Sequence, residues 1–473
     1  MDLRTTLPLA GLLLLVGGCA ESRPLRPARQ GAPGPTAPRT DAEAPAAALS
    51  AGKLPAKPTL GDYLAHAALH DPGLKAAFHR WRAASQRAPQ VRSLPDPTFT
   101  YRYFIEEVET RVGAQRQGIA LAQRLPWFGK LPLRGSAAAD AADAERQRYE
   151  ARKLRLFYGV KEAYYEYYYL WRSLATVREN IRLLQNIEQI ALTRYKAAAA
   201  GSPDVIRLQV EMGKLDDQRR TLEDLRGPIS AKLNAAMNRP VGDELPWPQA
   251  IEDRDVTISD RQLLDSLERT SPELKALAHE VSRSRRGIEL ARKDYFPDVT
   301  VGVDYIQTAP STNGRHPADD GKDPVVAMVS VNLPIWREKL AAGLREARHR
   351  YHAAVLRKRR KTNSLGVELK LVLFGYRDAE RKAKLFRDTL LPKAGQSLKT
   401  TQVAFQTGKA SFNDVIDAQR ILLEFQLARE RALSNKAQRL AELEMLTGRE
   451  IPRAGAAPPA KGREKPTKTD KEK

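Results

Sequence analysis

Few residues of this 473-residue sequence have the side chains and the arrangement that catalysis or metal binding requires. Its single cysteine, Cys19, excludes an intrachain disulfide and any cysteine-based zinc or iron–sulfur site. The seven histidines are scattered, and the sequence shows no nucleophile with a base, no carboxylate pair around a pocket and no phosphate-binding loop. Asp414 and Asp417 are one helical turn apart, so both can lie on one face of a helix. We expect no enzymatic activity, no cofactor and no metal site.

Cys19 lies at the end of a short N-terminal signal. A single arginine, an apolar stretch from Leu7 to Val16 and two glycines precede it, which is typical of a secretory signal peptide and too short for a spanning helix. A cysteine at this place resembles the lipobox of bacterial lipoproteins, in which the thiol receives a diacylglycerol. By the same resemblance, Ala20 favours export to the outer membrane. We predict a signal peptide over residues 1–18 and a lipid anchor on Cys19, worth about 0.8 kcal/mol of membrane affinity for each buried methylene.

Composition separates the ends of the chain from its body. Residues 19–58 are rich in Pro and Ala and predict a flexible linker, and residues 451–473 are polar and Lys-rich, so neither segment can bury a core. The formal net charge is +22, and the run Arg357–Lys361 would suit a nucleic-acid partner. An exported lipoprotein does not meet nucleic acid, so we expect no such partner and interpret the run as a solvated helix face.

The body of the chain contains an internal sequence repeat, with a period close to 200 residues. Four pairs of matching segments keep this offset: residues 71–79 with 271–279, 94–97 with 296–298, 125–128 with 333–336, and 201–209 with 411–419. The last pair aligns two Asp-Val-Ile turns. We predict an internal duplication, with a first repeat over residues 59–258 and a second over residues 259–450.

Each repeat reads as a short helix, two strands, a very long helix and a shorter return helix. Apolar residues at helical spacing predict the first long helix over about residues 136–200, roughly 100 Å at 1.5 Å per residue. Its counterpart spans about residues 339–407, where Pro392 should kink it. Return helices are expected over residues 203–237 and 412–446. The aromatic run Tyr164–Trp171 is interpreted as packing and interfacial residues near the strands.

The strands have the alternation of a membrane barrel or of a half-buried soluble sheet. Apolar and polar side chains alternate in four segments, residues 98–105, 119–125, 299–305 and 329–333. The long helices leave no second layer to cover the apolar faces, which favours a barrel that crosses a membrane. Four strands cannot close a barrel, and lipid does not tolerate open edges, so the chain must oligomerise. A trimer supplies twelve strands, with residues 107–114 and 308–323 as exposed loops.

Together, the cysteine signal, the repeated strand–strand–helix–helix unit, the strand exit Leu125–Lys130 and the Asp-Val-Ile turns resemble the TolC-like outer-membrane efflux factors over about residues 59–450. The chain is most similar to the lipoprotein branch that works with heavy-metal or multidrug pumps of the resistance-nodulation-division type. The resemblance implies an α+β membrane protein, a trimeric 12-stranded β-barrel in the outer membrane continuous with a long periplasmic α-helical barrel. It further implies an exit duct in outer-membrane lipid that passively receives substrates from an inner-membrane pump and a periplasmic adaptor.

The resemblance also implies roles for the helix tips. In that family the periplasmic end is closed by helix turns and ringed by acidic residues, a pattern that falls here on Asp414 and Asp417, with helix capping as the alternative for Asp414. Rings of carboxylates in a narrow neck would raise one another's pKa and attract cations. Tyr195 and Phe405 occupy positions that are aromatic in the family's gate, with core packing as the alternative. Adaptor docking is implied for the tip residues Gly201, Ser202, Gly408 and Lys409, where glycine permits a left-handed turn.

The competing hypothesis, from another class, is a periplasmic coiled-coil lipoprotein that acts as an adaptor or structural tether, with its strands in a soluble β-domain. It predicts a water-soluble protein once the lipid is removed, whereas a duct requires detergent. Both hypotheses place the protein outside the cytoplasm, because both retain the signal and Cys19.

Overall fold

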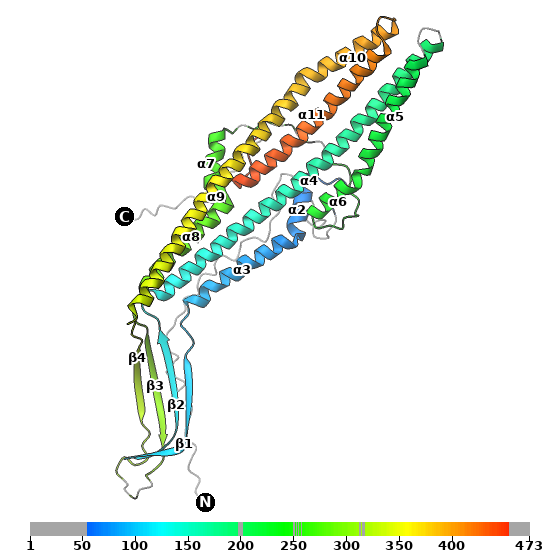
Figure 1. The fold of residues 1–473 in the computed structure, drawn as a ribbon. Coiled ribbons are helices and arrows are strands. Elements are labelled where there is room, and N and C mark those ends of the chain that lie inside the picture. Colours follow the sequence, from blue (N-terminus) through cyan, green and yellow to red (C-terminus); the bar gives the residue numbers. More distant parts are fainter. Residues whose placement is uncertain are drawn as a thin grey trace, which may run out of the picture.

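A computed structural model of the chain describes residues 54–196, 202–248 and 251–453, except residues 252, 254, 257, 312, 313, 315 and 316. Cys19, the signal peptide, Gly201 and most of the two terminal segments therefore lie outside the described residues. Figure 1 shows an elongated molecule, with a four-stranded sheet at one end and helices that run away from it for the rest of its length.

The two halves of the chain follow the same order of elements. The first half contains α2 (Leu60–His70), α3 (Pro72–Arg92), β1 (Thr98–Thr110), β2 (Gly113–Leu125), α4 (Lys130–Lys196), α5 (Ser202–Asp224) and α6 (Arg226–Ala236). The second half contains α7 (Asp260–Thr270), α8 (Pro272–Lys293), β3 (Val299–Thr308), β4 (Val325–Val331), α9 (Arg337–Leu385), the π-helix η1 (Phe386–Leu390), α10 (Leu391–Gln406) and α11 (Phe412–Thr447).

Each half begins with the same helix-capping motif. The hydroxyl of Thr59 caps α2 and the hydroxyl of Ser259 caps α7, and in both cases the side chain three residues later accepts a bond from the capping residue's amide. Such a capping box satisfies two backbone donors that a helix start otherwise leaves free. A proline at the first position of the next helix, Pro72 or Pro272, then starts α3 or α8.

The long helices contain one break that the sequence predicted and one that it did not. α4 is continuous over 67 residues, but its counterpart contains η1 immediately before Pro392. Proline has no amide hydrogen and its ring collides with the carbonyl four residues earlier, so the wider π turn accommodates the expected kink. The first return helix was predicted to be unbroken, which is wrong: it divides at Leu225, next to Gly227 and Pro228.

The helices form one curved layer whose members change along its length. Near the sheet the neighbours are α3, α4, α8 and α9, and at the far end α10, α11, α4 and α5 lie together (Figure 1). The aromatic run of α4 packs in a core with α2 and α6, where Tyr167 is fully buried. Tyr164 lies about 50 Å along α4 from the sheet, so the prediction that these residues lie near the strands is wrong, and only their packing role is confirmed.

The sheet has the order β1-β2-β3-β4, all antiparallel, and therefore two free edges. Its register places apolar residues of neighbouring strands in the same rows, as in Phe99, Leu121 and Val303. These side chains are exposed on one face, and the other face carries polar residues that include the ion pair between Arg102 and Asp304. The alternation predicted from the sequence is confirmed.

The loops and edges complete the description of the sheet. The predicted exposed loop over residues 107–114 is wrong, because β1 and β2 are joined only by Arg111 and Val112, with Gly113 at φ 119° closing the turn. The edge strands differ in length: β1 has 13 residues and β4 has seven. None of the helices in the described part of the chain combines the length and apolar character needed to cross a membrane.

Candidate functional site at the helix tips and strand exits

Two helical turns, α4–α5 and α10–α11, lie at the end of the molecule away from the sheet and are called the tips here. The structure describes the turn between α10 and α11 completely. α10 ends at Gln406, and Gly408 adopts φ 79°, so the predicted need for a left-handed residue at this position is confirmed. Lys409 is exposed beside it. The hydroxyl of Ser411 then caps α11. Gly201 of the other tip lies outside the described residues, and Ser202 is the first residue of α5.

Asp414 closes the capping box of α11. Its Oδ2 accepts hydrogen bonds from the amide and the hydroxyl of Ser411, both at 2.8 Å, and its own amide donates to the Ser411 hydroxyl at 3.3 Å. These bonds favour the charged carboxylate and lower the pKa of Asp414. The side chain is exposed. Asp414 thus takes part in capping and also presents a negative charge at the tip.

Asp417 lies one turn further along the same exposed face of α11 and has a partner that the sequence analysis missed. Nη1 of Arg420 lies 3.2 Å from Asp417 Oδ1, and the same guanidinium forms an ion pair with Glu211 of α5. Arg207 of α5 also donates to Asn413 at 2.9 Å. Arg420 therefore links the two helical hairpins and partly neutralises the predicted acidic face.

The two aromatic candidates lie in different surroundings. Phe405 is 4% exposed and packs edge-on against Phe412, with ring centroids 5.8 Å apart, inside the core that joins the two hairpins. Tyr195 is 49% exposed near the end of α4. In this conformation only Tyr195 presents its ring at the surface, whereas Phe405 stabilises the tip.

A second polar cluster holds the strand exits together. Asp298, just before β3, accepts bonds from Lys130 Nζ at 2.7 Å, from the amide of Trp127 at 3.0 Å and from Arg124 at 2.7 Å. Burial alone would raise the pKa of Asp298, but these donors lower it to about 2. The ring of Trp127 stacks on Phe296 with centroids 5.4 Å apart. Two of the repeated sequence motifs thus meet where the strands become helices.

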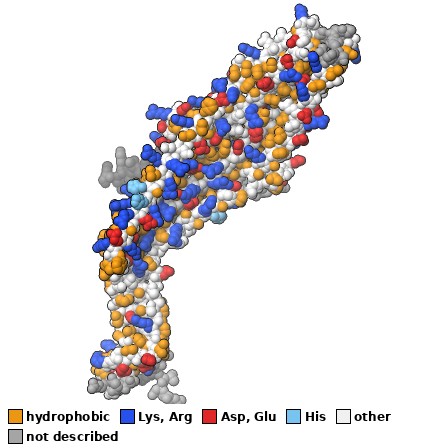
Figure 2. All heavy atoms as spheres, in the orientation of Figure 1, with side chains coloured by type: hydrophobic (Ala, Val, Ile, Leu, Met, Phe, Trp, Pro, Cys, Tyr) orange, Lys and Arg blue, Asp and Glu red, His pale blue; other side chains and the backbone are white. Residues whose placement is uncertain are grey.

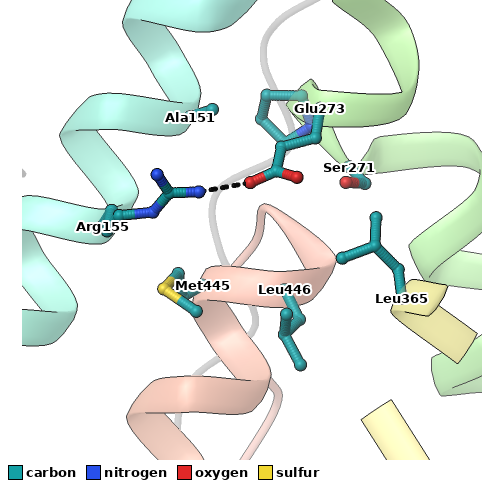
Figure 3. A pocket seen from close by; sticks show the side chains of 8 residues that line it. Ala151, Arg155, Ser271, Glu273, Leu365, Met445 and Leu446 are labelled. Atoms are coloured by element: carbon teal, nitrogen blue, oxygen red, sulfur yellow. Dashed lines mark hydrogen bonds and ion pairs between the residues drawn. The ribbon is translucent and has the colours of Figure 1, made fainter. Parts of the chain in front are cut away.

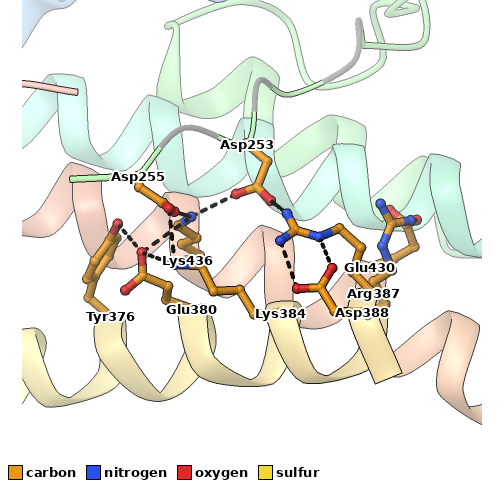
Figure 4. Close-up of polar contacts among 10 residues, drawn as sticks. Asp253, Asp255, Tyr376, Glu380, Lys384, Arg387, Asp388, Glu430 and Lys436 are labelled. Atoms are coloured by element: carbon orange, nitrogen blue, oxygen red, sulfur yellow. Dashed lines mark hydrogen bonds and ion pairs between the residues drawn. The ribbon is translucent and has the colours of Figure 1, made fainter. Parts of the chain in front are cut away.

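A third cluster fastens the segment between α6 and α7 across the helices (Figure 4). The ammonium of Lys436, 7% exposed, lies 2.7 Å from Asp253 and 3.1 Å from Asp255. Lys384 also contacts Asp255 at 3.0 Å, and the two lysines lower the pKa of that carboxyl to about 2. Arg387, in η1, forms an ion pair with Asp253 at 3.3 Å. The segment is therefore tied to α11 and to the π turn.

The cavities of the described part of the chain show no catalytic arrangement of side chains. An open groove of about 320 Å³ is lined by Gln189, Ile190, Thr193 and Gln406, none of which is an acid, a base or a thiol. The cavity in Figure 3 has a volume of about 20 Å³, room for one water, and the ion pair of Arg155 with Glu273 at 2.6 Å crosses it. His66 and His70 stack at 4.2 Å rather than converging on a point. No group of three His, Cys, Asp or Glu side chains there could hold a metal ion.

The four-stranded sheet is joined end-on to a layer of very long helices, and the described tip, between α10 and α11, lies at the end of this layer away from the sheet (Figure 1). A model of the outer membrane efflux proteins matches residues 64–235 and 263–449, most of both halves. The chain belongs to the outer membrane efflux protein family, and the resemblance inferred from its sequence is confirmed. It is an outer-membrane exit duct that extends into the periplasm and is not an enzyme. Family membership favours the duct over the tether.

Individual relatives agree with this assignment. The cobalt-zinc-cadmium resistance protein CzcC of Cupriavidus metallidurans is 23% identical over 413 residues, which cover 83% of this chain and 90% of CzcC. The outer membrane protein VceC of Vibrio cholerae superposes with a TM-score of 0.64 at 18% identity, covering 83% of this chain and 96% of VceC. The open state of the Neisseria gonorrhoeae channel MtrE gives a TM-score of 0.64 at 17% identity, covering 83% and 89%. The fold is that of outer-membrane channels.

Proposed function

We propose that three copies of this chain close their sheets into a 12-stranded β-barrel in the outer membrane and their helices into one periplasmic duct. The observation that carries the proposal is the sheet itself: both edges are free in the described chain, and one face exposes large apolar side chains over most of β3 and β4 and the adjoining parts of β1 and β2. Lipid covers such a face, whereas unpaired backbone groups at an edge are costly there. Closing β4 of one copy against β1 of the next satisfies both edges.

The helices support the same assembly. Near the sheet the layer runs from α3 to α9, so both of these helices lie at an edge of the protomer. α9 carries an exposed apolar stripe, opposite its buried face, with no partner in the described chain. The stripe consists of Leu356, Val367, Leu371 and Phe374. A second copy would bury it and complete a ring of helices beneath the barrel.

The tips would form the narrow end of the duct. In a trimer, Asp414 and Asp417 supply two rings of three carboxylates, which attract cations in a neck of low dielectric. The ion pair of Arg420 with Glu211 would act as a latch between hairpins, because outward movement of α11 relative to α5 must break it, whereas Asp417 moves with Arg420 on the same helix. We assign adaptor docking to the two tips, around residues 201–202 and 408–409, with the inner-membrane pump behind the adaptor.

The terminal segments would serve as anchor and tail. Residues 1–18 would be removed as a signal peptide, Cys19 would carry the lipid, and residues 19–58 would link it to the first repeat, 59–258. The second repeat, 259–450, precedes a Lys-rich tail, 451–473. Metabolic labelling with radioactive palmitate tests this arrangement: the wild type should incorporate label and Cys19→Ser should not, and equal labelling of both would disprove it.

Oligomeric mass and single-channel conductance of the detergent-purified protein test the duct. A mass of three chains with conductance in planar bilayers supports it, and a water-soluble monomer without conductance refutes it. Two neighbouring substitutions on β4 sharpen the test. Val329→Arg places a charge on the exposed apolar face at a cost of about 2–4 kcal/mol in lipid and should prevent insertion, whereas Ser330→Arg, on the opposite face, should not.

A further inference from the structure

The positive charge of the protein is concentrated on the part of α9 near the sheet. Residues 337–361 contain ten Lys and Arg against two Glu, a net charge of +8. The corresponding stretch of the first half, residues 130–154, has six against four, a net charge of +2. Figure 2 shows Lys and Arg side chains gathered over this half of the helical part. The repeat does not account for the charge, because only one of its copies has it.

Seven of these ten cations form no ion pair within the described residues, and four of the seven are consecutive. Arg345 pairs with Glu338 at 3.6 Å, Arg350 with Glu346 at 2.5 Å and Lys361 with Glu273 at 2.6 Å. Within the described residues, no ion pair is formed by the exposed side chains of Arg357, Lys358, Arg359 and Arg360. Four like charges on consecutive residues repel one another, so the structure holds an uncompensated cationic band around α9.

The helical geometry puts Arg357 and Arg359 on the two sides of the unpartnered apolar stripe, with Arg360 within about 20° of the centre of the stripe and Lys358 on the opposite side of the helix. At 100° per residue, the stripe that includes Leu356 and Phe374 lies opposite the buried positions Ala354 and Leu365. Arg357 then lies about 80° to one side of the stripe and Arg359 about 80° to the other. When a second copy covers the stripe, one arginine must face the interior of the ring and the other the exterior.

The opposite edge of the protomer cannot neutralise these charges. α3, which would meet α9 across the seam, contains five Lys and Arg and no acidic residue in its 21 residues. We propose that the segment Arg357–Arg360 forms, in the trimer, a cationic ring that binds anions in the wall of the duct, about 30 Å below the barrel. This inference rests on the proposed function. The cationic ring would make the part of the duct near the barrel prefer anions, whereas the acidic tips would prefer cations.

Ion selectivity in planar bilayers tests the ring. We measure the reversal potential under a potassium chloride gradient at low ionic strength, where screening is weak. Lowering the potential at the ring by one kT per unit charge lowers the partition of chloride about threefold and raises that of potassium about threefold. Arg357→Gln or Arg359→Gln should therefore lower the chloride-to-potassium permeability ratio by about sevenfold. Only one of them should do so, since the two side chains lie about 160° apart. Arg381→Gln, at an exposed arginine paired with Asp378, is the matched control.

A second probe measures binding directly. Inorganic triphosphate added on the barrel side should reduce the conductance of the wild type, and the same single variant that changes selectivity should relieve this block. Trimers that conduct normally but show unchanged selectivity and unchanged block in both variants would overturn the ring and leave the duct standing. Equal effects of both variants would overturn the geometric assignment. A monomer without conductance would overturn the duct and the ring together.

Discussion

Replacing Lys130 by methionine should destabilise the junction between sheet and helices. Lys130 and Asp298 are both almost completely buried and lie 2.7 Å apart. Methionine keeps the length of the side chain but removes the ammonium, so the carboxylate stays buried with two donors, Arg124 and the Trp127 amide. Losing one partner of a fully buried ion pair costs about 3–5 kcal/mol. Since two of the donors remain, we expect about 2–3 kcal/mol, the value of a charged hydrogen bond.

The effect of this substitution should depend on pH. The folded-state pKa of Asp298 is about 2, below its ordinary value of 3.8. A carboxyl with a lowered pKa stabilises the fold fully above the unfolded value and loses that contribution as the pH falls through the folded value. Lys130→Met raises the folded pKa toward the ordinary value. The difference between wild type and variant should therefore be largest above about pH 4 and shrink toward pH 2.

Urea unfolding in detergent, followed by circular dichroism at pH 7 and pH 3, measures both effects. The control is Lys382→Met, which removes an exposed pair with Asp378 on α9 and should cost no more than about 0.5 kcal/mol. A loss at Lys130 as small as the control's would show that Asp298 does not need the ammonium. A large loss of equal size at both pH values would refute the electrostatic explanation and leave packing as the cause.

Asp417→Ala should weaken cation block of single-channel conductance without changing the trimeric mass; unaltered block would remove Asp417 from the lumen. Arg420→Gln should raise the open probability by breaking the contact between hairpins, and identical gating to wild type would show that it is no latch. Gly408→Ala should cost about 1–2 kcal/mol, because alanine is strained at φ 79°; an unchanged unfolding midpoint would contradict this. Lys436→Met should increase protease cleavage between α6 and α7, since Asp253 and Asp255 each lose one of their two cationic partners, and a cleavage pattern like that of the wild type would count against the fastening role.

The apolar face of the sheet could be predicted from the sequence, because it depends on local periodicity. Phe99 and Leu121 share a face by period two alone, and the pairing register agrees. The loop between β1 and β2 was misjudged because Glu107 and Glu109 are polar, yet they lie in a strand that extends beyond the apolar zone. Polarity marks exposure to water, and it does not by itself mark the end of a strand.

The contacts of the site could not be predicted from the sequence where they depend on packing between distant segments. Asp414 and Asp417 could be placed on one exposed face from their spacing, as the structure has them. The pairing of Arg420 with Glu211 joins residues 209 positions apart and follows from how two hairpins lie against each other. The burial of Phe405 against Phe412 likewise depends on the tightness of the tip turn, which a sequence pattern does not specify.

The difference in length between the edge strands β1 and β4 would set how deeply a barrel lies in the membrane. β4 offers seven residues to the neighbouring copy, about 23 Å of paired edge, which matches an apolar band of about 25 Å. A neighbouring β1 of 13 residues would be paired only over Thr98–Phe104, and the rest, Ile105–Thr110, would stand free. That remainder contains three glutamates. The boundary of the apolar band at the end of the sheet away from the helices would therefore fall near Ile105, and Glu106–Thr110 would form a charged rim beyond it.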